Sequence, residues 1–257
     1  MRFTERLRYG TGRHQFGTLH VPRSQSRPNG VVVLVHGGFW RWPFNRWVMA
    51  LISHDAVRRG FAVLNVEYRR LGRFGGGGGW PATFDDVTDA VTTVSHRFPD
   101  LPLWVVGHSA GGHLALFAAA RLAECVDGVV SVSAPTDLRT MSRRGSDAVD
   151  ELVAGAPLPD RWSLTSPIEM LPTGVPTVCV HGEDDTTVLP EMSVRYVEAA
   201  LAAGDDARLV LVSGEGHRSV LLASSQTWRA VIESLDRWAD GGHAVSRNIS
   251  SVTKDGG

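Results

Sequence analysis

The stretch VVGHSAGGHLALF, residues 105–117, decides the fold. An apolar run typical of a buried strand ends in the motif GHSAG (107–111), and a helical pattern of small and apolar residues follows at once. This fits Gly-x-Ser-x-Gly, in which a serine stands on a strained turn from strand to helix and its neighbours, here Gly107 and Gly111, must be small. The motif predicts that Ser109 is presented for chemistry. The alternative is a glycine turn with an N-capping serine.

Strand-like and helical patterns alternate on both sides of this stretch, from residue 16 to residue 239. Several of the strand-like runs are continuously apolar, which is typical of buried parallel strands. The alternation predicts an α/β fold with a mostly parallel sheet of about eight strands and helices on both faces. The opening strand or two, within 8–21, should pair antiparallel at one edge. The predicted strands are 15–21, 31–37, 61–68, 103–108, 128–134, 176–182 and 207–214, and the predicted helices are 44–59, 82–98, 110–123, 190–203 and 219–239.

Two segments interrupt this rhythm. The segment 69–81 holds five consecutive glycines, but it lacks the Gly-Lys-Ser/Thr of a phosphate-binding loop, so we interpret it as a flexible loop ending at Trp80. The segment 136–174 holds scattered prolines and one weak helix at 146–154. An insertion after one strand and before the next is a candidate lid.

The length of 257 residues, of which 43% are hydrophobic, suits one large α/β domain, which we place at 1–240. The polar, glycine-rich tail 241–257 is expected to be disordered and outside the fold.

The formal net charge of -1 gives no electrostatic reason to expect a nucleic-acid or membrane partner. The two cysteines, Cys125 and Cys179, imply no disulfide framework and favour a reduced compartment. The N-terminus lacks the apolar core of a signal peptide, and no apolar run is long enough to cross a bilayer. We therefore expect a cytoplasmic protein. The sequence leaves its oligomeric state, monomer or homodimer, open.

A nucleophilic serine needs a base, and the base needs a group that orients it. In this architecture the chain order is serine, acid, histidine. Two later strands end in loops that supply both groups: one loop holds Glu183, Asp184 and Asp185, and the next holds His217. We assign His217 as the base and Asp185 as the acid, with Asp184 as the near rival and Glu183 less favoured. Each could be an ordinary loop residue, but together with Ser109 in the required order they favour a catalytic triad.

The motif HGGFW (36–40) follows another predicted strand. Glycine lets backbone N–H groups approach a carbonyl under attack, so we expect an oxyanion hole there. Its predicted donors are the amides of Ala110 and Gly38, with Phe39 as a further donor. His36 is interpreted as a brace of the loop. The same interpretation applies to His108, His113 and His181.

The stretch FWRWPFNRW (39–47) gathers five aromatic residues around this loop. Some could line a substrate pocket, and we name Trp40, Trp42 and Trp80 as candidates. The alternative is that the aromatics anchor the first helix to the sheet. The same stretch holds Arg41 and Arg46. They could bind a substrate carboxylate or could be solvated surface residues. No histidine spacing matches a zinc signature, so we predict no metal.

With these segments identified, the chain resembles the α/β-hydrolases over residues 9–238. The motif HGGFW is similar to the HGGxW signature of kynurenine formamidases and their esterase relatives. The resemblance implies a serine hydrolase without a cofactor that acts on a small ester or amide. It also implies that Ser109, Asp185 and His217 form the triad. The lead-in 9–22, the pair Trp80-Pro81 and the pair Asp85-Asp86 are similar to that branch as well.

Other functions of the same fold stay open at this point. A peptidase-like enzyme would need acidic residues near the lid, for which Asp150 and Glu151 are the candidates; a thioester hydrolase is a further alternative. A biosynthetic acyltransferase or cyclase would use the same triad with water excluded. A non-catalytic binding protein is the least favoured, because such proteins usually lose a member of the triad.

Overall fold

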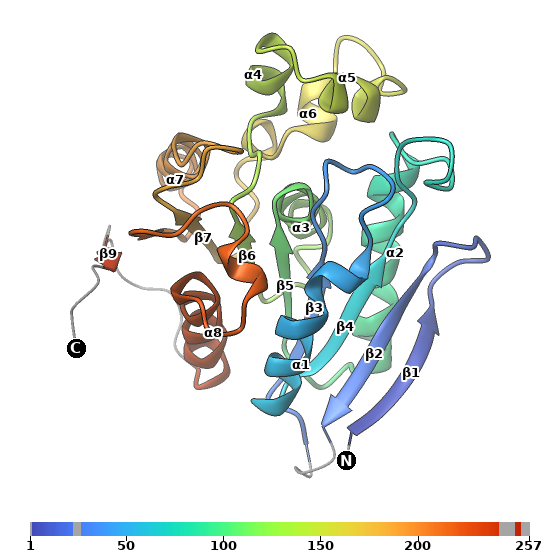
Figure 1. Cartoon of the computed structure of the whole chain (residues 1–257), viewed down its shortest axis with the longest axis vertical. Helices are drawn as coiled ribbons and strands as arrows, with labels where there is room; N and C mark the ends of the chain where they lie inside the picture. The colour runs from blue at the N-terminus through green and yellow to red at the C-terminus, as the bar shows by residue number, and fades with distance from the viewer. Residues whose placement is uncertain (1, 23–26, 242–249, 253–257) are drawn as a thin grey trace.

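The computed structural model of the chain describes residues 2–22, 27–241 and 250–252. Strand pairing within these ranges builds one sheet, with neighbouring strands parallel from β4 to β9 and antiparallel at the β1–β2–β4 edge (Figure 1). The predicted mostly parallel sheet with an antiparallel edge is confirmed. The strand order is β1 (Arg2–Arg8), β2 (Phe16–Pro22), β4 (Ala62–Glu67), β3 (Val31–Val35), β5 (Leu103–His108), β6 (Gly128–Val132), β7 (Thr177–Gly182), β8 (Ala207–Val212) and β9 (Ser250–Val252).

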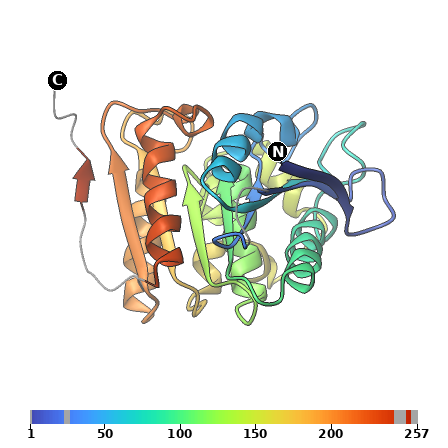
Figure 2. The ribbon, with the colours of Figure 1, turned by 90° about the horizontal axis from the view of Figure 1, so that it is seen from below.

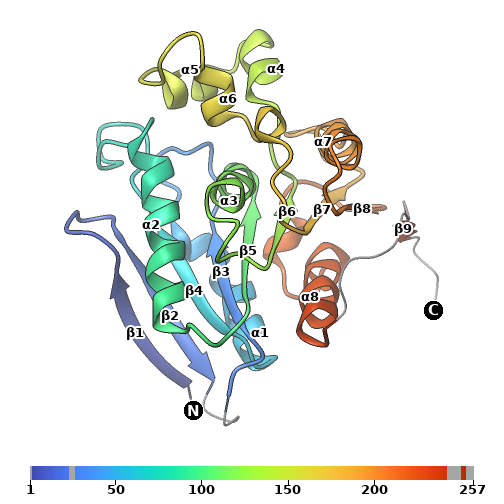
Figure 3. The same cartoon turned by 180° about the vertical axis from the view of Figure 1, so that it is seen from behind.

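Helices cover both faces of the sheet, and each face has its own hydrophobic cluster (Figures 2 and 3). Successive side chains of a strand point to opposite faces. In β3, for example, Val33 belongs to the first cluster and its neighbours Val32 and Leu34 to the second. The first cluster includes residues of α2 (Ala82–Arg97), α3 (Ala110–Arg121) and α7 (Glu191–Ala202), and the second includes residues of α1 (Ala50–Arg58) and α8 (Gln226–Ala239).

Two predicted helices each consist of a short 3-10 turn and a later α-helix. The predicted helix 219–239 is a short 3-10 turn, η3 (Ser219–Leu221), followed by α8. Ser225 has an extended backbone and its side chain accepts the N–H of Trp228, so α8 begins after it. The predicted helix 44–59 is likewise η1 (Arg46–Met49) followed by α1.

The segment 136–174 contains more helix than the sequence predicts. The weak helix expected at 146–154 is present as α5 (Asp147–Val153). The helices α4 (Leu138–Arg143) and α6 (Arg161–Thr165) are too short to show a clear helical period, so the sequence pattern missed them. They lie together with α5 at one end of the molecule (Figures 1 and 3), and η2 (Pro167–Met170) leads back toward β7.

The consecutive glycines wrap around the backbone of Arg70. The N–H of Arg70 donates to Gly75 O (2.7 Å), and the N–H of Gly78 donates to Arg70 O (2.9 Å). A Cβ atom would lie 2.1 Å from Arg70 O at Gly75 and 2.3 Å from Arg70 C at Gly78. These positions therefore need glycine because two backbone segments meet there, and the segment is a tightly bonded loop rather than a loosely held one.

The remaining predictions about the whole chain have mixed outcomes. Cys125 and Cys179 are unpaired. In the described ranges, every helix is too short or too polar to traverse a bilayer. The tail predicted at 241–257 lies mostly outside the described residues, except that Ser250–Val252 pairs with β8 as β9. The domain boundary at residue 240 stays a prediction.

Candidate active site

Ser109 stands on the turn between β5 and α3 with a strained backbone (φ 54°, ψ −122°). A non-glycine residue in such a conformation costs about 1–3 kcal/mol, which the surrounding packing must supply. The packing is tight: a Cβ atom at Gly107 would lie 2.0 Å from Gly111 O, and one at Gly111 would lie 2.0 Å from Val35 O. Only glycine fits on either side of Ser109, as the motif predicts.

The three residues of the predicted triad come together at the carboxyl end of the sheet. His217 follows β8, Asp185 follows β7 and Ser109 follows β5. His217 Nε2 lies 3.0 Å from Ser109 Oγ, and His217 Nδ1 lies 2.7 Å from Asp185 Oδ2. Asp185 is buried, whereas Asp184 and Glu183 are exposed. The structure therefore joins Asp185, and not its rivals, to the histidine.

Asp185 is held by donors on both of its oxygens. Oδ1 accepts the N–H groups of Thr187 (2.9 Å) and Val188 (3.0 Å), and Oδ2 lies 3.2 Å from His181 Nε2 in addition to His217. Burial on its own raises the pKa of Asp185, but the hydrogen bonds from His181, His217 and Val188 outweigh it and hold the pKa well below its usual range. Asp185 is thus a fixed carboxylate near neutral pH.

His181 is a site residue whose contact with the acid the sequence analysis missed. It is fully buried, its Nδ1 lies 2.7 Å from Ser193 Oγ, and its Nε2 lies 2.8 Å from Val188 O as well as near Asp185. The interpretation of His181 as a brace is confirmed. Its position at the end of β7, four residues before Asp185, is the signal that could have linked the two.

His108 braces the base from the other side. Its Nε2–H donates to the backbone carbonyl of His217 (2.7 Å), and the two rings lie 4.9 Å apart. Burial, reinforced by the nearby His217, lowers the pKa of His108 to about 3. His108 is therefore neutral and serves as a hydrogen-bond donor that fixes the loop of His217.

The HGGFW segment lies against the nucleophile in a left-handed backbone conformation. Gly38, Phe39 and Trp40 have φ angles of 119°, 53° and 54°. A Cβ atom at Gly37 would lie 3.0 Å from Ser109 Cβ. Within the described residues, the amides of Gly38 and Phe39 donate to no protein acceptor. Two free donors are thus available close to Ser109.

His36 holds the start of this segment, as predicted. It is fully buried and stacks on Tyr68 with 4.3 Å between ring centroids. Its Nδ1–H donates to Gly37 O (2.8 Å), while the Tyr68 hydroxyl donates to His36 O (2.8 Å). Both bonds fix the backbone from which the two free amides project.

The segment 136–174 is tied to the HGGFW loop. Trp40 Nε1–H donates to His113 Nδ1 (3.2 Å), so the proton of His113 is on Nε2, which donates to Thr165 O (2.8 Å). Burial lowers the pKa of His113 to about 4, which keeps this neutral form. A second link is the ion pair of Arg41 with Glu151 in α5 (2.6 Å).

The structure does not gather the three tryptophans named as pocket candidates. Trp40 is buried in the core at 2% exposure, and Trp80 packs edge-on against Phe84 and Phe117. Trp42 is 51% exposed and lines a pocket to which no triad residue contributes. A substrate-pocket role for them stays a prediction.

In the ranges that the structure describes, no cluster of three or more His, Cys, Asp or Glu side chains could hold a metal ion. The expectation of a metal-free, cofactor-free site stays a prediction.

The chain is similar to known esterases and amidases. It is 24% identical over 233 residues to a probable isoprenylcysteine alpha-carbonyl methylesterase, ICME, from Oryza sativa subsp. japonica, covering 79% of this chain and 55% of that protein. It is 27% identical over 108 residues to the kynurenine formamidase of Salmo salar, covering 42% of this chain and 35% of that protein. The chain thus spans about half the length of the first relative and about a third of the second.

A solved structure supports the fold. A truncated form of a carbohydrate esterase from gut microbiota superposes with a TM-score of 0.76 at 21% identity, covering 93% of this chain and 96% of that chain. The resemblance to the α/β-hydrolase esterase branch, formamidases included, is confirmed by these matches. The family model described as BD-FAE matches residues 18–200, which is more than half of the sequence. The chain therefore belongs to the BD-FAE family and has the α/β-hydrolase fold.

Proposed function

We propose that the protein is a serine hydrolase that cleaves a small carboxylic ester or amide through an acyl-serine intermediate. The observation that carries this proposal is the continuous contact from Ser109 Oγ through the His217 ring to Asp185, with distances of 3.0 and 2.7 Å. Both distances are within hydrogen-bond reach, which proton transfer requires. The BD-FAE match adds support from the family.

The geometry supports the following cycle. His217 Nε2 takes the proton of Ser109 as the oxygen attacks the substrate carbonyl. Asp185 keeps the proton of the imidazole on Nδ1 and stabilises the imidazolium. His217 then gives its proton to the leaving group, and a water molecule, activated by the same nitrogen, releases the acyl group from Ser109.

We assign the oxyanion hole to the amides of Gly38, Phe39 and Ala110. Ala110 is the first residue of α3, so its N–H has no acceptor inside the helix. The N-terminus of α3 also carries the positive end of the helix dipole, which favours a developing negative charge. The free amides of Gly38 and Phe39 approach from the facing loop. Preorganised donors of this kind are worth about 2.7–4 kcal/mol each in catalysis.

The names of the relatives suggest substrates within the proposed class. One relative is a methylesterase, one is a formamidase and one is a carbohydrate esterase. All three chemistries attack a carbonyl carbon and expel an alcohol or an amine. We therefore propose an ester or an N-formyl aryl amine as the substrate. We also propose that the segment 136–174 is the lid and, because Cys125 and Cys179 are unpaired, that the protein works in the cytoplasm.

The test is activity-based labelling with a fluorophosphonate, comparing the wild type with Ser109→Ala and His217→Ala. We expect labelling of the wild type alone. A panel of p-nitrophenyl esters and an N-formyl aryl amine then separates esterase from formamidase activity. A folded wild type that neither labels nor turns over any member of the panel would contradict the proposal.

A further inference from the structure

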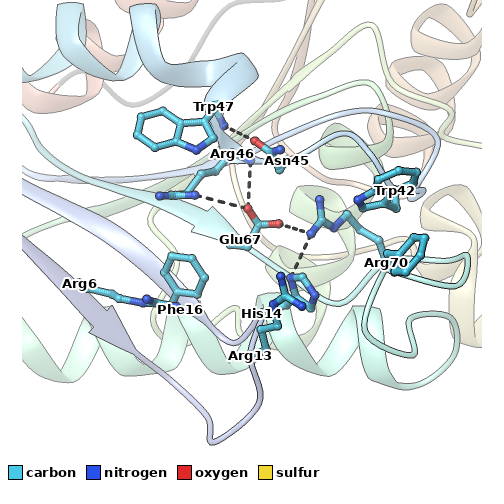
Figure 4. A pocket seen from close by; sticks show the side chains of 11 residues that line it. Arg6, Arg13, His14, Phe16, Trp42, Asn45, Arg46, Trp47, Glu67 and Arg70 are labelled. Carbon is cyan, nitrogen blue, oxygen red and sulfur yellow. Dashed lines mark hydrogen bonds and ion pairs between the residues drawn. The ribbon is translucent and has the colours of Figure 1, made fainter.

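A pocket of about 540 Å³ lies beside the antiparallel edge of the sheet, at the end of β4 (Figure 4). Its walls come from β1, the β1–β2 turn, the start of β2, the loop 42–47 and the glycine-rich loop. No member of the triad contributes to its lining. Its volume is within the usual range of small-molecule sites, about 300–1,000 Å³.

The lining of this pocket is strongly cationic. Four arginines, Arg6, Arg13, Arg46 and Arg70, face a single carboxylate, that of Glu67. Glu67 lies 2.8 Å from Arg70 Nη2 and 3.7 Å from Arg46 Nη1, so it compensates about one of the four charges. Burial raises the pKa of Glu67, but the contact with His36 and the charge of Arg70 outweigh it, so the net shift is downward and Glu67 is ionised.

The histidine of the pocket adds no positive charge. Arg70 Nη2 lies 3.1 Å from His14 Nδ1 and donates to it, so this nitrogen carries no proton. Burial, and then the charge of Arg70, lower the pKa of His14. Among the described residues that line it, the pocket therefore keeps a surplus of positive charge over its one carboxylate, that of Glu67.

Several guanidinium groups of the pocket have N–H donors that are available to a ligand. In the part of the chain that the structure describes, neither Arg6 nor Arg13 pairs with a carboxylate. Arg70 is 3% exposed, and its Nε has no hydrogen-bond partner there. A buried donor without an acceptor costs about 1–3 kcal/mol, so an anion that reached Arg70 would recover this energy.

Arg70 is held in place before any ligand arrives. Gly75 and Gly78 bond its backbone from both sides, and its Nη1 donates to Phe44 O. Its remaining terminal nitrogen is shared by Glu67 and His14. A preformed donor loses little entropy on binding. The glycine-rich loop, which is no phosphate loop, thus has a physical role in presenting Arg70.

Exposed aromatic rings lie around the arginines of the pocket. Trp42, Trp47 and Phe74 are 51%, 67% and 57% exposed, and all three line the pocket. Trp42 and Phe74 meet edge to face at 5.3 Å, and the Arg46 guanidinium lies 4.5 Å from the Trp47 ring. Large, solvent-exposed apolar side chains clustered around a pocket are typical of a binding site. Flat apolar surface on a ligand would fit against these rings.

We infer that this pocket binds an organic anion, a carboxylate or a phosphate carried on a flat aromatic body, with Arg6, Arg13 and Arg70 on the anion and Trp42 and Trp47 on the ring. Guanidinium groups match the planar and bidentate geometry of both anions. Because the triad takes no part in the lining, the inference does not depend on the proposed function.

Isothermal titration calorimetry of the full chain tests it with four probes: 2-naphthoate, 2-naphthyl phosphate, uncharged 2-naphthamide and acetate. We expect both naphthyl anions to bind, and the amide and acetate to bind at least about tenfold more weakly. Tighter binding of the phosphate would assign a phosphorylated ligand, and tighter binding of 2-naphthoate a carboxylate. Equal affinity for the amide and the anions would overturn the inference.

The location is tested with charge-matched variants. Arg6→Gln/Arg13→Gln removes two exposed arginines of the pocket, and we expect affinity for the preferred anion to fall by at least about tenfold. Arg58→Gln/Arg121→Gln removes two exposed arginines from α1 and α3, outside the pocket, and should leave affinity unchanged. An equal loss in both pairs, or no loss in the first, would refute the site even where the anion binds.

Discussion

His217 Nδ1 and His181 Nε2 lie 2.7 and 3.2 Å from the same oxygen of Asp185, Oδ2. The other oxygen accepts two backbone N–H groups, from Thr187 and Val188. A carboxylate with donors on both oxygens cannot rotate, and its position sets the orientation of the His217 ring. The precision of the triad therefore depends on the turn after β7 as much as on the three residues themselves.

Asp185→Asn should lower kcat/KM by about 10³–10⁴-fold, because an amide donor at this position selects the wrong tautomer of the base. Steady-state hydrolysis of a p-nitrophenyl ester measures the loss, and thermal unfolding checks that the variant folds. Asp184→Asn is the matched control, since Asp184 is exposed and next in sequence. Its activity should stay within about twofold of the wild type, as surface changes usually do. The reverse pattern would give the acid role to Asp184.

His181 is predicted to act as a positioning residue. His181→Leu should lower kcat by at least about tenfold with KM nearly unchanged, because one donor to Asp185 is lost. His181→Gln keeps a donor of similar reach and should recover part of kcat. Melting temperatures of both variants separate this effect from folding. If both variants lose stability equally but keep the kcat of the wild type, His181 only supports the core.

The sequence predicted the triad because each member lies in the segment that follows a strand, and the carboxyl ends of parallel strands meet at one edge. The spacing of four residues between His181 and Asp185 could have suggested a contact, but its geometry was not predictable, since it depends on the turn that brings Val188 back to His181. The aromatic stretch leaves a different question open. Composition cannot tell a ring that faces the core, as in Trp40, from one that faces solvent, as in Trp42.

The cationic pocket could not be predicted from the sequence. Its arginines come from β1, a turn, the loop 42–47 and the glycine-rich loop, and none of these positions forms a motif. The break before α8 follows from a single serine cap, that of Ser225, which a helical pattern over 219–239 conceals. Patterns along one element are predictable, whereas contacts between distant loops require the fold.

The turn that carries Ser109 should not accommodate a methyl group added at Gly111. Gly111→Ala places a Cβ atom 2.0 Å from Val35 O, so either β3 or the Ser109 turn must move. We expect loss of fluorophosphonate labelling, with a fall in melting temperature if β3 shifts. Gly216→Ala is the control, because its Cβ would lie 3.5 Å from the nearest atom, an ordinary contact. Normal labelling of Gly111→Ala would show that the turn is looser than the structure indicates.

The free energy of unfolding should fall as pH decreases from about 6.5 to about 4. Burial lowers the pKa of His108 to about 3 and that of His113 to about 4. In this window the unfolded chain binds a proton at each histidine and the folded chain does not, so acid favours unfolding. Each histidine contributes a slope of up to about 1.4 kcal/mol per pH unit.

Urea unfolding at several pH values measures this slope. His113→Gln removes one buried imidazole and should reduce the slope, whatever its effect on stability at neutral pH. His54, an exposed histidine in α1, provides the control His54→Gln, which should leave the slope unchanged. A free energy of unfolding that stays constant across the window would show that the two histidines bind protons as readily in the folded chain as in the unfolded chain.

The ion pair of Arg41 with Glu151 should affect substrate binding more than stability. Both side chains are about half exposed, at 40% and 46%, so the pair contributes at most about 1 kcal/mol to folding. It nevertheless joins the HGGFW loop to α5. If the segment 136–174 is a lid, Arg41→Gln and Glu151→Gln should each change KM several-fold and the double variant should add nothing further. Additive changes in KM, or none, would show that α5 does not act on the site through this pair.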